Sequence, residues 1–232
     1  MSKYFNITFF KELFQFKNSS RSEKAKKNIV ILFLLQVFNF LTLMAIVPLT
    51  LNYLGKTDYG IWLTLASTLN WLINLDFGLG NGLRNKLAEA FALNDIKLAR
   101  FYISTAYAVF TIGIAAAFII YVTIHGLLNW GNILQAPDGY TSLLNSLVLY
   151  VIILFLVHFL LKLIASVINA DQRPALNGGL SLIINTITLI GIYLLSKYAQ
   201  PSLTLFGLVS SGIPVLVFFI ASIILFGGYF RN

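Results

Sequence analysis

Charged residues are scarce in this chain of 232 residues, of which only 10% are Asp, Glu, Lys or Arg and 58% are apolar or aromatic. Soluble domains carry about 25% charged residues, so an ordinary water-soluble domain is not expected. Cysteine is absent, which excludes disulfides, thiolate nucleophiles and zinc sites built on thiolates. The sequence also lacks the HExxH, GxSxG and GxxxxGKS/T motifs of metalloproteases, serine hydrolases and P-loop ATPases. We therefore expect no enzymatic activity, no metal ion and no cofactor.

Six long stretches carry almost no charge, and each is long enough to cross a bilayer, which takes about 20 to 25 helical residues. Hydrocarbon offers the backbone no hydrogen-bond partner, so such segments are helices, and the alternation typical of outer-membrane strands is missing. The predicted spans are 29–53, 59–82, 101–124, 140–161, 175–196 and 202–226. The predicted fold class is an all-α integral membrane protein in which residues 28–230 form one six-helix lobe.

The N-terminal segment, residues 1–27, carries seven basic residues before the first span. Phe9, Phe10, Leu13 and Phe14 share one helical face, which indicates a short helix at the inner membrane interface. A disordered tail in which these aromatics fall by chance is the alternative. No small-residue cleavage pattern follows the first apolar run, so the segment is not a cleavable signal peptide.

The net charge of +8 would suggest a nucleic-acid partner in a soluble protein, but the basic residues are placed as in a membrane protein. Cytoplasmic loops carry an excess of Lys and Arg. With six spans, fourteen of the sixteen basic residues fall on one side, and only Lys56 and Lys197 fall on the other. We therefore expect both termini in the cytoplasm, contact with membrane lipids and no nucleic acid.

Polar side chains form stripes on four of the predicted spans. At 100° per residue, Ser67, Asn70, Asn74, Asn81 and Arg84 fall within an arc of about 100° on the second span. The other stripes are Gln36, Asn39 and Thr42; His158, Lys162, Ser166 and Asn169; and Asn177, Ser181, Asn185 and Thr188. Such residues commonly bond across packed helices. Together, however, they favour a hydrated cavity or a surface that awaits a partner.

Several single residues have more than one interpretation. His158 could relay a proton, or it could be a hydrogen-bonded bundle histidine; its pairing with Ser181 as an intramembrane protease has little support. Arg84 and Lys162 could bind a phosphate or pyrophosphate headgroup, or serve only orientation and contact with anionic lipid. A channel is not favoured, since no filter-like repeat or acidic ring occurs.

The stretch from Leu54 to Arg100 is the most distinctive part of the sequence. It contains the pattern LGxxxYGIW, with Tyr59, Gly60 and Trp62, followed by DFGLGNGLRNKLAEA from Asp76 to Ala90. The second block holds Gly78, Gly80 and Gly82. Together with ADQRPAL at 170–176 and SLTLFGLVSSGIP at 202–214, these features resemble the N-terminal part of bacterial polysaccharide exporters. The branch concerned is the O-antigen flippase-like branch of the multidrug/oligosaccharidyl-lipid/polysaccharide exporter superfamily.

The resemblance implies a secondary transporter built from two similar helical lobes around a polar cavity. Such a protein moves polyprenyl-pyrophosphate-linked oligosaccharide across the bacterial cytoplasmic (inner) membrane in O-antigen and lipopolysaccharide synthesis. This chain resembles the N-terminal lobe only, so we expect a truncated half that associates with a missing second lobe or another copy. Arg84 and Lys162 are expected to meet the pyrophosphate. The remaining predicted substrate-binding residues are Asn70, Asn74, Asn81, His158, Asn177, Ser181 and Asn185.

Two other functions remain open. A drug or small-molecule antiporter of the same superfamily would need a carboxylate deep in the membrane for ion coupling, and only Asp76, near one end of its span, qualifies. The other alternative is an inactive membrane fragment or scaffold that transports nothing.

Overall fold

The computed structural model describes residues 21–74 and 78–229, and all their regular structure is helical. The prediction of an all-α protein is therefore confirmed. The expected interfacial helix near Phe9 lies outside the described residues. The elements are α2 (Arg21–Asn74), α3 (Leu79–Ala92), α4 (Ile96–His125), α5 (Trp130–Ile133), α6 (Thr141–Leu161), α7 (Leu163–Ala170), α8 (Pro174–Tyr198), α9 (Leu203–Ile224) and a π-helical turn, η1 (Leu225–Tyr229).

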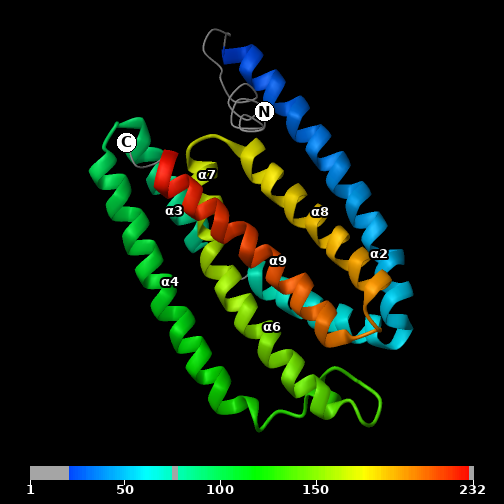
Figure 1. The fold of residues 1–232 in the computed structure, drawn as a ribbon. Helices are drawn as coiled ribbons and strands as arrows, with labels where there is room; N and C mark the ends of the chain where they lie inside the picture. The colour runs from blue at the N-terminus through cyan, green and yellow to red at the C-terminus, as the bar shows by residue number, and fades with distance from the viewer. Residues whose placement is uncertain (1–20, 75–77, 230–232) are drawn as a thin grey trace, which may run out of the picture.

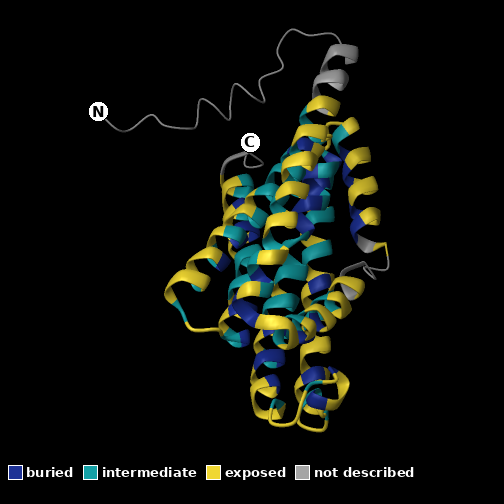
Figure 2. Cartoon of the chain, turned by 90° about the vertical axis from the view of Figure 1, so that its right-hand side faces the viewer, coloured by how far each residue is buried: buried dark blue, intermediate teal, exposed yellow. Residues whose placement is uncertain are grey.

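Five of the described helices are long and apolar enough to cross a membrane, which makes the chain a multi-pass membrane protein. They cover Ile29–Trp71, Ile96–His125, Thr141–Ala170, Pro174–Tyr198 and Leu203–Gly227. Their outer sides are exposed (Figure 2) and carry large apolar side chains such as Phe33, Ile112 and Leu216. A soluble protein rarely exposes apolar surface on this scale, whereas acyl chains would cover it in a bilayer.

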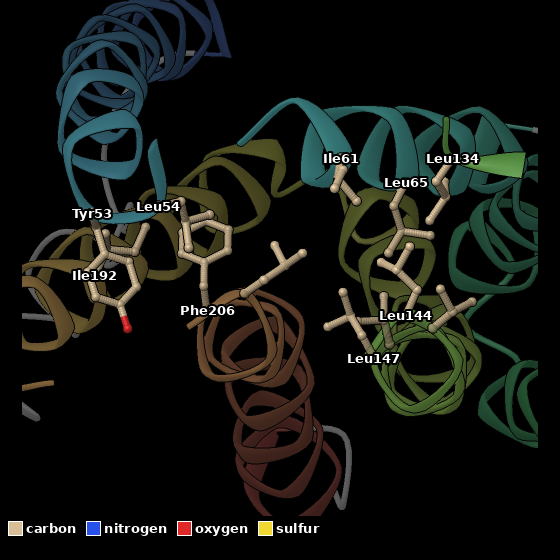
Figure 3. Packing of buried hydrophobic residues seen from close by; sticks show 12 residues of the cluster. Tyr53, Leu54, Ile61, Leu65, Leu134, Leu144, Leu147, Ile192 and Phe206 are labelled. Carbon is tan, nitrogen blue, oxygen red and sulfur yellow. The ribbon is translucent and has the colours of Figure 1, made fainter. Parts of the chain in front are cut away.

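The first of these five helices consists of two helical segments that meet at Gly55. The backbone of Gly55 has φ 78° and ψ 172°, a conformation open to glycine because it has no Cβ. Figure 1 shows the chain turning back at this point, and Figure 3 shows Tyr53 and Leu54 on one segment and Ile61 and Leu65 on another. Residues 21–54 and 56–74 thus run in different directions.

The long helices form a bundle with two distinct ends (Figure 1). The Gly55 turn, the connection that contains α5, and the α8–α9 connection lie at one end, which we call the Gly55 end. The short helices α3 and α7 lie at the opposite end, the α3 end, together with the start of α2 and the end of α9. In this view α4 lies at one edge of the bundle and the first segment of α2 at the other, with α6, α9 and α8 between them.

The first segment of α2 packs in parallel against α8 along a seam with coiled-coil spacing. Buried or half-buried residues recur at alternating steps of three and four, which is the pattern of a left-handed helix pair. They are Leu32, Leu35, Asn39, Thr42, Ile46, Leu49 and Tyr53 on α2, and Gly178, Ser181, Asn185, Thr188, Ile192 and Leu195 on α8. At Gly178 the missing Cβ would lie 3.5 Å from Leu35 Cδ1 and 3.6 Å from Leu32 Cδ2. Glycine therefore permits this close approach.

Two apolar clusters hold the ends of the bundle. The cluster at the Gly55 end (Figure 3) joins Ile61 and Leu65 to Leu144, Leu147 and Phe206. At the α3 end, the cluster joins α3 and α7 to α4 and α9. Its members include Leu87, Ile164, Val167, Ile168 and Phe218. Apart from Thr50, the largest fully buried side chains of the described residues all belong to these two clusters.

Candidate functional site

The amides of Asn39 and Asn185 bond to each other across the α2–α8 seam. Asn185 Nδ2 donates to Asn39 Oδ1 at 2.6 Å, and both side chains are half-buried. On the same face of α8, Ser181 Oγ donates to the carbonyl of Asn177 at 3.3 Å. The expectation that the polar stripes line a hydrated cavity or a surface that awaits a partner is therefore not met by Asn39 and Asn185. For this pair the alternative, a bond between packed helices, holds.

The polar face of residues 56–74 is exposed. Thr64, Ser67, Thr68 and Asn70 are all exposed, and at 100° per residue Ser67 and Asn70 lie on the side opposite the buried Ile61 and Leu65. Thr64 Oγ1 donates to the Gly60 carbonyl at 3.1 Å, and Thr68 Oγ1 donates to the Thr64 carbonyl at 2.9 Å. These two hydroxyls are thus satisfied within their own helix. Ser67 and Asn70 complete an outward-facing polar surface.

The predicted stripe on the second span does not continue along one helix. The described helix stops at Asn74, whose side chain lies outside the described residues, as does Asp76. The next described residue is Gly78, whose φ of 74° is left-handed, and it caps the N-terminus of α3. Asn81 and Arg84 therefore belong to α3, and the assumption of an unbroken helix that aligned them with Ser67 and Asn70 is wrong. Gly78, Gly80 and Gly82 lie at the start of α3, where Gly82 N donates to the Gly78 carbonyl at 2.7 Å.

The basic residues at the α3 end come from different elements. Arg84 is exposed on α3, which buries Leu83 and Leu87, whereas Lys162 is half-buried at the junction of α6 and α7. One turn before Lys162, the ring of His158 lies 5.4 Å from that of Phe218, at an interplanar angle of 31°. Lys162 and His158 are thus both half-buried, and His158 packs against an aromatic ring. Arg84 faces outward.

Two ion pairs lie at the α3 end of the bundle. Lys86 and Glu89 lie 3.1 Å apart on the exposed side of α3, and this hydrogen bond raises the pKa of the lysine. Arg173 Nε lies 3.0 Å from Asp171 Oδ2 in the α7–α8 turn. Salt bridges on exposed surfaces contribute about 0 to 1 kcal/mol, so the exposed Lys86–Glu89 pair does little for stability. The Arg173–Asp171 pair is more covered, with side chains 36% and 27% exposed.

The centre of α9 carries polar atoms on its inner face. Ser210 and Pro214 lie on the same side of the helix as the buried Phe206 and Val217, yet both are only half-buried. Ser210 Oγ is itself buried and has no hydrogen-bond partner among the described residues. Pro214 also lacks the N–H that would bond the carbonyl of Ser210. Polar groups are therefore less well satisfied midway along α9 than near its ends.

The LGxxxYGIW pattern occupies the Gly55 end and packs into its apolar cluster. Tyr59 and Trp62 are half-buried against that cluster, and the rings of Trp62 and Phe206 meet edge to face with centroids 5.1 Å apart. At Gly207 an added Cβ would lie 3.3 Å from Trp62 Cζ3. Gly60 is exposed and supplies only its carbonyl, to Thr64.

Two tyrosines at the same end make hydrogen bonds that the sequence did not predict. Tyr53 Oη donates to the carbonyl of Gln200 at 2.9 Å, and Tyr140 Oη donates to Asp58 Oδ1 at 2.7 Å. The hydrogen bond to Asp58 raises the pKa of the Tyr140 phenol, with a smaller contribution from burial. The partners lie 147 and 82 residues apart in sequence, so no local pattern could reveal them.

A metal site is not formed by the described part of the chain, where no group of three His, Asp or Glu side chains is positioned to hold an ion. The chain matches no protein-family model, and neither curated proteins nor solved structures gave a significant match.

Proposed function

We propose that this chain is one lobe of a flippase that moves polyprenyl-pyrophosphate-linked oligosaccharide across the bacterial cytoplasmic membrane. The lobe would cross the membrane six times, because the two segments of α2 count as separate spans. Residues 56–74 form 19 residues of helix, about 28 Å at 1.5 Å per residue, close to the hydrocarbon thickness of about 30 Å. The start of α2 and the end of α9 lie at the same end of the bundle (Figure 1), which supports an even number of crossings.

The observation that carries the proposal is the exposed polar face of residues 56–74. Ser67 and Asn70 are exposed beside the apolar Leu63 and Trp71 on a helix of membrane length, and polar side chains are costly to place against acyl chains. A hydrated path or a second lobe would cover this face. The resemblance of Leu54–Arg100 to polysaccharide exporters supports the choice of cargo.

The mechanism we favour moves the headgroup through the bundle while the polyprenyl tail stays in lipid. Dragging a charged pyrophosphate through hydrocarbon would cost at least several kcal/mol. Arg84 and Lys162, both at the α3 end, would meet the pyrophosphate at the cytoplasmic mouth. Asn70 and Asn177 would bond the glycan, and Asn185 bonds Asn39 across the α2–α8 seam.

Reconstitution tests the proposal. Vesicles that hold fluorescent lipid-linked oligosaccharide on one leaflet would be prepared over a range of protein-to-vesicle ratios below one copy per vesicle. If two lobes act together, the fraction of active vesicles should rise with the square of protein density. A linear rise would reject the half-transporter. Asn70→Ala should slow transfer, whereas the matched Asn145→Ala, an exposed amide on α6, should not.

The antiporter alternative draws less support from the described residues. Their carboxylates are Glu23, Asp58, Glu89, Asp95, Asp138 and Asp171, all near the ends of helices or in connections. Asp58 is bonded to Tyr140. A proton- or sodium-coupled antiporter would need a carboxylate deeper in the bundle, and Asp76 lies outside the described residues.

A further inference from the structure

The Gly55 turn is tied to both other connections at its end of the bundle. The bond from Tyr53 to Gln200 joins the turn to the α8–α9 connection, and the bond from Tyr140 to Asp58 joins it to the start of α6. The two bonds run in opposite directions relative to the turn. Tyr53, next to Gly55, donates to the α8–α9 connection, whereas Tyr140, at the start of α6, donates to Asp58 beside the turn.

Packing beneath these bonds closes the same end. Tyr53 is 4% exposed, and Leu144, Leu147 and Ile192 are fully buried. At Gly207 an added Cβ would lie 2.6 Å from Leu147 Cδ1, so α9 and α6 approach as closely as a glycine allows. The helices α6 and α9 are therefore closely packed at this end.

Two features allow the turn to move as a hinge. Gly55 adopts a positive φ that strains any other residue, and nothing lies within 4 Å of where its Cβ would be. Pro48 removes one backbone hydrogen bond from α2 two turns earlier, which permits a bend. A change of backbone angles at Gly55 would therefore separate the two segments of α2 without unwinding either.

We propose that the Tyr53–Gln200 and Tyr140–Asp58 bonds form a latch that holds the Gly55 end of this lobe closed, with Gly55 as the pivot on which it opens. In the orientation proposed above, this end faces away from the cytoplasm. The latch itself follows from the contacts, and only its role in gating transport rests on the proposed function.

Distances between spin labels test the latch directly, because the chain has no native cysteine. The substitutions Lys56→Cys and Lys197→Cys, both at exposed positions, would carry the spin labels in the full chain in lipid nanodiscs, and pulsed EPR would measure the distance between them. The parent should show one narrow distribution. Removing both phenol hydroxyls with Tyr53→Phe and Tyr140→Phe should increase the ratio of the longer-distance to the shorter-distance population by about 25-fold, about fivefold for each bond.

Matched controls separate the latch from a general loss of structure. Tyr150→Phe and Tyr193→Phe remove exposed hydroxyls from α6 and α8 and should leave the distribution unchanged. Asp58→Ala should shift the distances, whereas Asp58→Asn keeps an acceptor for Tyr140 and should restore the closed distribution.

Superimposable distributions for the parent and the double tyrosine variant would overturn the latch, as would equal shifts in the control variants. The outcome is independent of transport. If the labels separate as expected while reconstituted vesicles move no oligosaccharide, the latch stands and the proposed function fails.

Discussion

Removing one partner of the Asn39–Asn185 bond should destabilise the α2–α8 pair by about 1 kcal/mol. The bond is short, at 2.6 Å, and both side chains are half-buried. Hydrogen bonds between membrane helices average about 0.6 kcal/mol and reach about 1.7, and a stranded buried amide costs about 1 to 3 kcal/mol. Half-burial places this pair near the lower end of both ranges.

A double-mutant cycle isolates the bond. Asn39→Ala, Asn185→Ala and the double variant would be unfolded reversibly by SDS in mixed micelles. We expect each single variant to lose about 1 kcal/mol and the double variant little more, which gives a coupling energy of about 1 kcal/mol. Asn177→Ala, on the same helix but without this partner, should add to Asn39→Ala within about 0.5 kcal/mol.

A coupling energy below about 0.3 kcal/mol would refute the structural role of the bond. The same variants bear on transport. If Asn185 serves only the seam, Asn39→Ala and Asn185→Ala should reduce transport equally, because both break the same contact. A much larger loss for Asn185→Ala would mean that its amide also meets the cargo.

Three further outcomes are expected. The contribution of Tyr140 to the free energy of unfolding should be constant below the ordinary phenol pKa of 10.0. It should fall as the pH rises through the raised pKa of the folded state, because a phenolate cannot donate a hydrogen bond. The difference in unfolding free energy between the parent and Tyr140→Phe, measured against pH, should therefore shrink. Gly207→Ala places a methyl group 2.6 Å from a leucine carbon and should cost about 1 to 3 kcal/mol, whereas Gly212→Ala, with nothing within 4 Å, should not destabilise. Leu87→Ala, at 0% exposure, should cost about 2 to 5 kcal/mol, and Leu93→Ala, at 67% exposure, less than about 0.5 kcal/mol by the same unfolding assay.

Hydropathy located the long helices because burying a backbone in hydrocarbon demands unbroken helix over a fixed length. The predicted spans 101–124, 140–161, 175–196 and 202–226 each fall on α4, α6, α8 and α9, displaced at their ends by a few residues. The second span was placed less well. The predicted span 59–82 is one continuous helix, whereas Gly78, with φ 74°, separates α2 from α3. A run of apolar residues does not show where a helix breaks.

The polar residues show the same division. Helical periodicity correctly placed Asn177, Ser181 and Asn185 on one face of α8. It could not decide what that face meets, since the amide of Asn39, which bonds Asn185, is 146 residues away. Asn70 also lies in a predicted polar stripe, but its side chain is exposed. Two asparagines of the same predicted kind thus have different environments.

Composition and charge scarcity by themselves determined that this chain is a multi-pass helical membrane protein, because the cost of exposing polar backbone to lipid is local and depends only on what each segment contains. The pairing of α2 with α8, the turn at Gly55 and the tyrosine bonds at that end were decided only by the tertiary structure. Each depends on side chains brought together from distant parts of the chain, and the free energy of those contacts exists only once the helices have packed.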